Sequence, residues 1–257
     1  MVTYIYDGSY EGLLTCVFVA FETKTAPNAI VVEQQQQLTL VGDSHIIKTD
    51  DTLAARVATG IDARSNYKAA TLVYKMFLSE LPQIEMTIYH VIKIVVTKNN
   101  PAILENFANS YILKAAQVAK MIHREVHRMH AFVRFQKTKD GIFYAAIEPD
   151  FNVMPLIGEH FVRRYADQPW IIFDTKRHYG LHYDKQDTHF VTVDDPIFNF
   201  KSGTIQKDFI DHKEKIYQAL WENYFASVNI KERKNIKLHL RHMPKRYWKY
   251  LIEKRVR

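Results

Sequence analysis

The sequence predicts an α+β fold, in which a helix-rich amino-terminal half packs with an antiparallel sheet of hairpin and meander strands, followed by a carboxyl-terminal helix. Two observations predict it. Apolar residues recur at helical spacing through most of 1–130, whereas alternating runs rich in β-branched and aromatic residues gather in 131–257. Clustered strands favour α+β over strictly alternating α/β folds. We expect one globular domain over 1–257, with these two ranges as its lobes.

The first half is expected to begin with a strand at 3–7 and a helix that Ser9 caps. A second strand is expected within 31–41. The Asn100-Pro101 pair should end one helix and start another, because Asn caps helices and Pro suits a first turn. The remaining helices are expected at 51–61, 65–81, 84–95 and 109–129.

The second half should open with a hairpin, because 131–137 and 142–149 alternate and TKDG lies between them. Pro155 is expected to start a short helix that runs to Tyr165. Three more strands and a last helix follow, expected at 170–177, 179–184, 189–193 and 205–227.

Composition limits the class of protein. The 257 residues are 47% hydrophobic, enough for one sizeable core. The single cysteine, Cys16, allows no disulfide within the chain and fits a reducing compartment. The start resembles no signal peptide, and no run approaches ~20 apolar residues. We therefore expect a cytoplasmic protein without a membrane segment.

Three histidines, His123, His127 and His130, fall on one face of the expected helix at 109–129 and its end. The spacing differs from the H-E-x-x-H zinc pattern, since Glu125 does not adjoin the first histidine. Flanking arginines would repel a cation, so no metal is expected. Two interpretations remain open: the imidazoles border the core, or they belong to a basic edge that faces phosphates.

Positive charge is concentrated near the carboxyl end. Residues 231–257 hold eleven Lys and Arg against two Glu, a net charge of +9, so 1–230 is near −2 within a chain of +7. Tyr247 and Trp248 lie among Lys245, Arg246 and further cations. Such interleaving suits stacking on bases with cations on the backbone, but it equally suits aromatic anchors with solvated lysines.

Several segments together resemble a bacterial family labelled as DNA metabolism or DNA repair proteins. They read YDGSYEGLL, HRMHAFVRF, IEPDFNVM, FVRRYADQPWIIFDTKRHYGLHYD and RHMPKRYWKYL. From about residue 82 the chain also resembles a domain of unknown function that occurs fused to uracil-DNA-glycosylase-like proteins. The resemblance implies a frequent companion, a radical-SAM protein with a role in DNA modification or repair. Its motif positions are Arg128, Phe132, Arg134, Glu148, Arg163, Arg164, Asp167, Trp170, Asp174, His242, Tyr247 and Trp248.

The function that we expect from the sequence is a nucleic-acid-binding accessory protein in DNA repair or DNA metabolism, acting with an enzyme partner and without a cofactor of its own. Arginine and lysine bind phosphates, and aromatic rings stack on bases. The expected contact residues are Arg128, Arg134, Arg163, Arg164, Arg177, Lys245, Arg246, Tyr247 and Trp248.

Two alternatives remain open. One is a glycosylase- or nuclease-like enzyme on DNA, with a carboxylate near Asp174 as general base or metal ligand. The other is a protein–protein adaptor whose charge serves solubility. The catalytic candidates for the enzyme are Asp174, Asp167, Glu148, Asp150 and His127.

Overall fold

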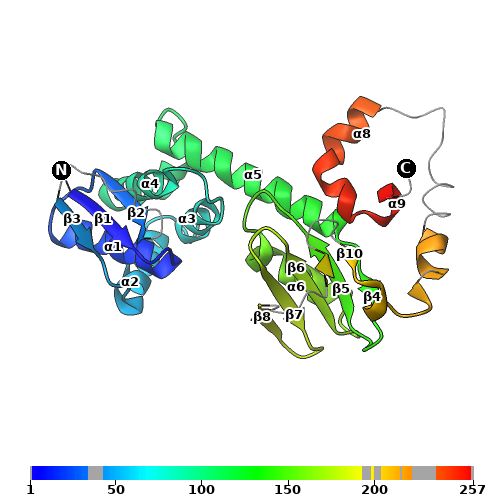
Figure 1. The fold of residues 1–257 in the computed structure, drawn as a ribbon. Helices are drawn as coiled ribbons and strands as arrows, with labels where there is room; N and C mark the ends of the chain where they lie inside the picture. Colours follow the sequence, from blue (N-terminus) through cyan, green and yellow to red (C-terminus); the bar gives the residue numbers. More distant parts are fainter. Residues whose placement is uncertain are drawn as a thin grey trace. The chain divides into compact units, whose positions relative to one another are not determined.

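The structure is a computed structural model that describes residues 2–33, 43–192, 198–199, 204–214, 216–221 and 236–255. The chain divides into two compact units, Met1–His123 (unit 1) and Arg124–Arg257 (unit 2). Both mix helices with strands, which confirms the α+β class (Figure 1).

Unit 1 contains a three-stranded sheet in the order β2-β1-β3, with both pairs parallel. Four α-helices lie wholly within the described part of this unit, so the amino-terminal half is helix-rich as predicted (Figure 1). The strands are β1 (Val2–Tyr6), β2 (Ala29–Val32) and β3 (Asp43–Ile46), and the helices are α1 (Tyr10–Glu22), α2 (Asp51–Ala63), α3 (Ala69–Phe77) and α4 (Ile84–Lys98).

The predicted caps of unit 1 are confirmed. The Ser9 hydroxyl accepts the Gly12 N–H at 2.9 Å and starts α1. The Asn100 side chain accepts the Ala102 N–H at 3.0 Å, and the segment that follows is the 3-10 helix η2 (Pro101–Glu105). Most of the strand expected at 31–41 lies outside the described residues.

Unit 2 contains a five-stranded sheet in the order β4-β5-β6-β7-β8. Its pairs are antiparallel, as expected, except that β5 and β6 run parallel with helix α6 (Met154–Arg164) between them in the chain. Alternation within a strand does not reveal the direction of its neighbour, so the sequence pattern missed this pair. The strands are β4 (Gln136–Lys137), β5 (Phe143–Ile147), β6 (Trp170–Asp174), β7 (Tyr179–Tyr183) and β8 (Thr188–Val191).

The strand expected at 131–137 is shorter than predicted, because helix α5 (Ser110–Phe132) continues into it. The Val133 N–H still donates to the carbonyl of Met129 at 3.2 Å, which prolongs the helical pattern. Only Gln136–Lys137 pairs with β5. The division between the units and the expected lobe boundary at 130/131 both fall within α5.

The helix expected at 205–227 is wrong at its start, where β10 (Thr204–Ile205) and η3 (Lys207–Phe209) lie instead. Residues 216–221 are helical, and 222–227 lie outside the described part of the chain. Short elements end unit 2: α8 (Ile236–His242), η5 (Lys245–Tyr250) and α9 (Ile252–Arg255). None of the helices within the described ranges is long and apolar enough to cross a membrane.

The two faces of the unit 2 sheet are covered by different segments. A Cβ on Gly158 of α6 would lie 2.6 Å from Leu181 Cδ2 of β7, so α6 packs closely on that face. On the other face, Tyr250 from η5 joins a cluster with Tyr144 and Phe173. The carboxyl-terminal segment is thus part of the core, which it reaches by way of Tyr250.

Candidate functional site

Unit 2 contains a cavity of about 770 Å³. Its wall is built by the end of α5, the segment that follows it, β4, the end of α6, the start of β6, the helical residues 216–221 and α9. The volume falls within the range of ordinary small-ligand sites. Its lining side chains come from distant parts of the sequence, so the folding of unit 2 creates the site.

Aromatic rings form much of this wall. Phe135 lies edge-on to Phe161 and Tyr165, with ring centroids 5.9 and 5.2 Å apart. Trp170 packs 6.1 Å from both phenylalanines and is fully buried. Its indole N–H meets no hydrogen-bond acceptor among the described residues. Trp221 lines the wall as well.

Polar and cationic groups share the wall. Arg164 is exposed, and its guanidinium lies 5.8 Å from the Tyr165 ring centroid. Lys137 and Gln168 are half-buried, and Gln218 donates a hydrogen bond to Glu214 at 3.1 Å. Ligand sites are mostly apolar with a few polar groups that fix the orientation of the ligand, and this wall has that composition.

His130 and His160 stack in the cavity wall, with ring centroids 3.9 Å apart and an interplanar angle of 11°. Burial lowers the pKa of His160, and the charge of Arg164 lowers it further. The His160 imidazole is therefore mostly neutral at pH 7 and presents both a donor and an acceptor. The histidine face expected from the sequence divides, because His123 and His127 are exposed while His130 joins this stack.

Arg134 does not extend freely toward solvent. Its guanidinium forms an ion pair of 2.8 Å with Glu253, whose side chain is fully buried, and it lies 5.1 Å from the Trp221 ring centroid. The Trp221 indole N–H also donates to Glu253, at 3.0 Å. Burial would raise the pKa of Glu253, but the hydrogen bonds and charge of Arg134 lower it below its ordinary value.

Glu125, which is 1% exposed, gathers four donors from different segments. The Tyr247 hydroxyl donates to it at 2.5 Å and the Asp150 N–H at 2.9 Å. Arg128 and Arg246 each approach it at 3.4 Å, and Arg246 also pairs with the Asp150 carboxylate at 2.6 Å. Three expected nucleic-acid contacts, Arg128, Arg246 and Tyr247, are therefore engaged inside unit 2.

The carboxyl ends of the parallel strands β5 and β6 bring three catalytic candidates, Glu148, Asp150 and Asp174, to one edge. Asp174 is fully buried and pairs with Arg177 at 2.8 Å, and Arg177 also donates to the Asp150 carbonyl at 3.2 Å. Lys249 and Tyr250 both donate to Glu148.

Each carboxylate at this edge thus has a cationic partner. Burial would raise the pKa of Glu148, but the hydrogen bonds from Lys249 and Tyr250 lower it overall. A carboxylate with a lowered pKa is a weaker base. Asp167 lies apart, exposed in the turn before β6, and His127 is exposed on α5.

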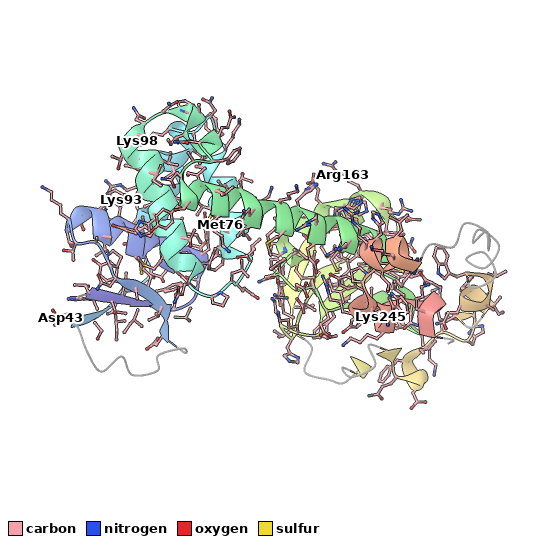
Figure 2. The ribbon with its side chains drawn as sticks, turned by 90° about the horizontal axis from the view of Figure 1, so that it is seen from above. Asp43, Met76, Lys93, Lys98, Arg163 and Lys245 are labelled. Carbon is pink, nitrogen blue, oxygen red and sulfur yellow. The ribbon has the colours of Figure 1, made fainter. Side chains whose placement is uncertain are left out.

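The remaining expected contact residues have different surroundings. Arg163 is 75% exposed at its side chain and pairs with Glu159, one helical turn away. Lys245 is exposed, and both cations are labelled in Figure 2. The Trp248 indole N–H donates to the Met243 carbonyl at 3.0 Å, and Lys254 lies 5.2 Å from its ring centroid. The described residues contain no group of three or more side chains arranged to hold a metal ion.

Sequence reasoning missed the cavity. It did not single out His160, Gln168, Glu214, Gln218 and Trp221 as lining residues. The one local signal was the density of aromatic and cationic residues around FVRRYADQPW, a pattern that fits either ion pairs or a polar pocket. The sequence pattern did not indicate that Glu214, Tyr217, Gln218 and Trp221 would line the cavity, because their position there depends on tertiary packing.

The comparison with protein families decides the classification. The model of the family described as Domain of unknown function DUF4130 matches residues 82–253, about two thirds of the chain. The chain belongs to this family. The match confirms the resemblance to a domain of unknown function from about residue 82 onward, and it includes every residue of the cavity wall. Among curated proteins, no match was found.

Proposed function

We propose that this DUF4130 protein is a nucleic-acid-binding accessory protein of DNA repair or DNA metabolism, acting in the cytoplasm with an enzyme partner. The single observation that carries the proposal is the set of exposed cations on α8 and at the start of η5. Lys237, Arg241 and Lys245 are exposed and have no acidic partner among the described residues. Such cations are available to neutralise phosphates, with release of bound counterions.

The footprint differs from the one expected from the sequence. Arg134, Arg177 and Arg246 are held by buried or half-buried acids, so their charge is largely neutralised within unit 2. Turning one of them toward a phosphate would leave a buried carboxylate without its partner, which is costly. We therefore assign the contact with the nucleic-acid backbone to Lys237, Arg241 and Lys245.

The test uses the full chain and fluorescently labelled duplex and single-stranded oligonucleotides, titrated at several salt concentrations. A Lys237→Glu/Arg241→Glu/Lys245→Glu variant should bind more weakly, and its log–log salt slope should become shallower by about one for each phosphate that is no longer neutralised. Its matched control is Lys93→Glu/Lys98→Glu/Lys114→Glu, which makes the same charge change at exposed positions of unit 1 (Figure 2 labels Lys93 and Lys98).

Loss of binding in the unit 2 variant alone supports the proposal. Equal loss in both variants would mean that only net charge matters, and no binding by the unmodified protein at low salt would refute it. Partner capture is tested separately: a pull-down of a radical-SAM or uracil-DNA-glycosylase-like protein that survives nuclease treatment supports the accessory role.

The enzyme alternative has one observation in its favour, the convergence of Glu148, Asp150 and Asp174 at one sheet edge. Incubation with oligonucleotides that carry uracil, alkylated or oxidised bases, with and without divalent metal, tests it. Cleavage that Asp174→Asn abolishes, in a protein that remains folded, would favour an enzyme over an accessory protein.

A further inference from the structure

We propose that the unit 2 cavity binds one unpaired nucleotide of a nucleic-acid strand, with the base among the aromatic rings and the phosphate on Arg164 and Lys137. This inference rests on the proposed function, because it says which part of a bound nucleic-acid strand, one unpaired nucleotide, occupies the cavity. It concerns a different surface from Lys237, Arg241 and Lys245, none of which lines the cavity.

The rings account for the base. Phe135 and Tyr165 are half-buried and leave part of their rings exposed, and they pack in one cluster with the fully buried Trp170, with neighbouring centroids 5.2 to 6.1 Å apart. Stacking on aromatic side chains contributes about 1–3 kcal/mol per base and tolerates any base, because every base has a π-face. A paired base within a duplex has both faces covered by its neighbours, so only an extruded or single-stranded base can enter.

The polar groups account for the base edge. Gln168 offers an amide donor and acceptor, and the neutral His160 imidazole offers one of each. The indole N–H of Trp170 has no acceptor among the described residues, but it is fully buried and is therefore not assigned to the base.

The cations account for the phosphate. Arg164 is exposed at the end of α6, where it approaches Tyr165 and donates a 3.4 Å hydrogen bond to the phenol. Lys137 is half-buried, with its ammonium 5.9 Å from the Phe143 ring centroid. Neither side chain forms an ion pair within the described part of the chain. Arg134, by contrast, is neutralised by Glu253 and is not assigned to the phosphate.

The first experiment titrates the full chain with deoxynucleoside 5′-monophosphates and follows tryptophan fluorescence. Of the three tryptophans, Trp170 and Trp221 line the cavity and Trp248 does not. A base in the cavity should therefore quench the emission saturably, and a Trp248→Phe variant should retain the quenching.

Two variants and a matched control locate the phosphate. Arg164→Ala and Lys137→Ala should each weaken binding of the monophosphates about tenfold, the effect of losing one charge-assisted hydrogen bond. Lys139→Ala is the control, because Lys139 is exposed two residues beyond Lys137 and does not line the cavity. Circular dichroism of each variant checks that it is folded.

The second experiment separates the strand from a free nucleotide. A hairpin oligonucleotide with one unpaired base should displace a bound monophosphate, whereas the same hairpin with an abasic site there should displace it far less. If inorganic phosphate displaces the bound monophosphate as effectively as a second monophosphate does, the assignment of the aromatic rings to the base is wrong. Failure of every oligonucleotide to displace the monophosphate would overturn the assignment to a strand.

Failure of the inference is distinguishable from failure of the proposed function. If DNA binds through α8 and η5 but no monophosphate quenches the emission, the inference is wrong and the proposed function stands. If monophosphates bind and no oligonucleotide does, the proposed function fails, and so does the assignment of the cavity to a strand.

Discussion

The hydroxyl of Tyr247 donates a 2.5 Å hydrogen bond to the carboxylate of Glu125, a residue 122 positions earlier in the chain. Both side chains are almost fully buried. Burial raises the pKa of Tyr247 and the neighbouring Glu125 carboxylate raises it further, so the phenol remains a donor at any physiological pH. This interaction ties the carboxyl-terminal segment to α5, and it explains why an aromatic residue within a basic segment is structural.

Tyr247→Phe should therefore destabilise unit 2 by about 1–3 kcal/mol, because it leaves a buried carboxylate with one donor fewer. Urea unfolding followed by tryptophan fluorescence measures this, since all three tryptophans belong to unit 2. Tyr217→Phe is the control, because Tyr217 is 55% exposed and should change the free energy of unfolding by less than about 0.5 kcal/mol. Equal stability of the two variants would contradict the assigned role.

The ion pair between Arg134 and Glu253 gives a second prediction. Arg134→Ala should lower the free energy of unfolding of unit 2 by about 3–5 kcal/mol, because it leaves the fully buried Glu253 carboxylate without its ionic partner. Glu253→Ala should cost less, because the Arg134 side chain that it leaves behind is 19% exposed. The double variant should lose much less than the sum of the two, and this non-additivity is the measurement. Additive losses would mean that the two side chains do not interact.

Acid should destabilise unit 2 because it protonates the carboxylates of Glu148 and Glu253. The pKa values of Glu148 and Glu253 lie below their ordinary value of 4.5 in the folded protein. A lowered folded pKa contributes stability that is fully present above pH 4.5 and is lost as the pH falls from there through the folded pKa. Unfolding midpoints measured from pH 7 downward should show this loss.

The matched comparison for the acid experiment is Arg134→Met, which removes the interaction that lowers the pKa of Glu253. Its stability should depend less on pH in the same range, although it starts from a lower value. A stability profile that is flat between pH 5 and pH 3 in the unmodified protein would refute the linkage.

Cys16 offers a probe of unit 1. The side chain is fully buried in α1, and burial raises the pKa of its thiol to about 12. Alkylation depends on the thiolate and on access, so iodoacetamide at pH 8 should leave Cys16 unmodified in the native protein and modify it fully in denaturant. Mass spectrometry measures the reaction. Rapid labelling of the native protein would contradict the packing of α1.

The elements that the sequence predicted best are those whose signals are local. The Ser9 cap bonds to Gly12, three residues away, and the apolar stripe of α4 recurs every three or four residues. Such patterns report on hydrogen bonds and faces within one element, so no distant residue is needed to interpret them. The end of α5 was missed because residues 131–135 alternate like a strand while the helix continues to Phe132.

Local sequence patterns did not predict which residues surround each charged side chain in the folded protein. Arg163 and Arg164 are neighbours in the sequence, yet only Arg164 lines the cavity. Arg134 and Lys245 both looked like phosphate contacts, but Arg134 meets Glu253, which lies 119 residues later, whereas Lys245 remains exposed. The identity of a cation's partner depends on which strands and helices pack together.

Composition and periodicity were thus sufficient for the α+β class, most helix and strand positions, the lack of a disulfide within the chain and the basic carboxyl-terminal segment. The parallel pairing of β5 with β6, the neutralisation of Arg134, Arg177 and Arg246 by acids, and the cavity itself emerged from packing. The physical reason is range: backbone hydrogen bonds and amphipathic faces are set within a few residues, whereas ion pairs and cavities join side chains that are far apart in the chain.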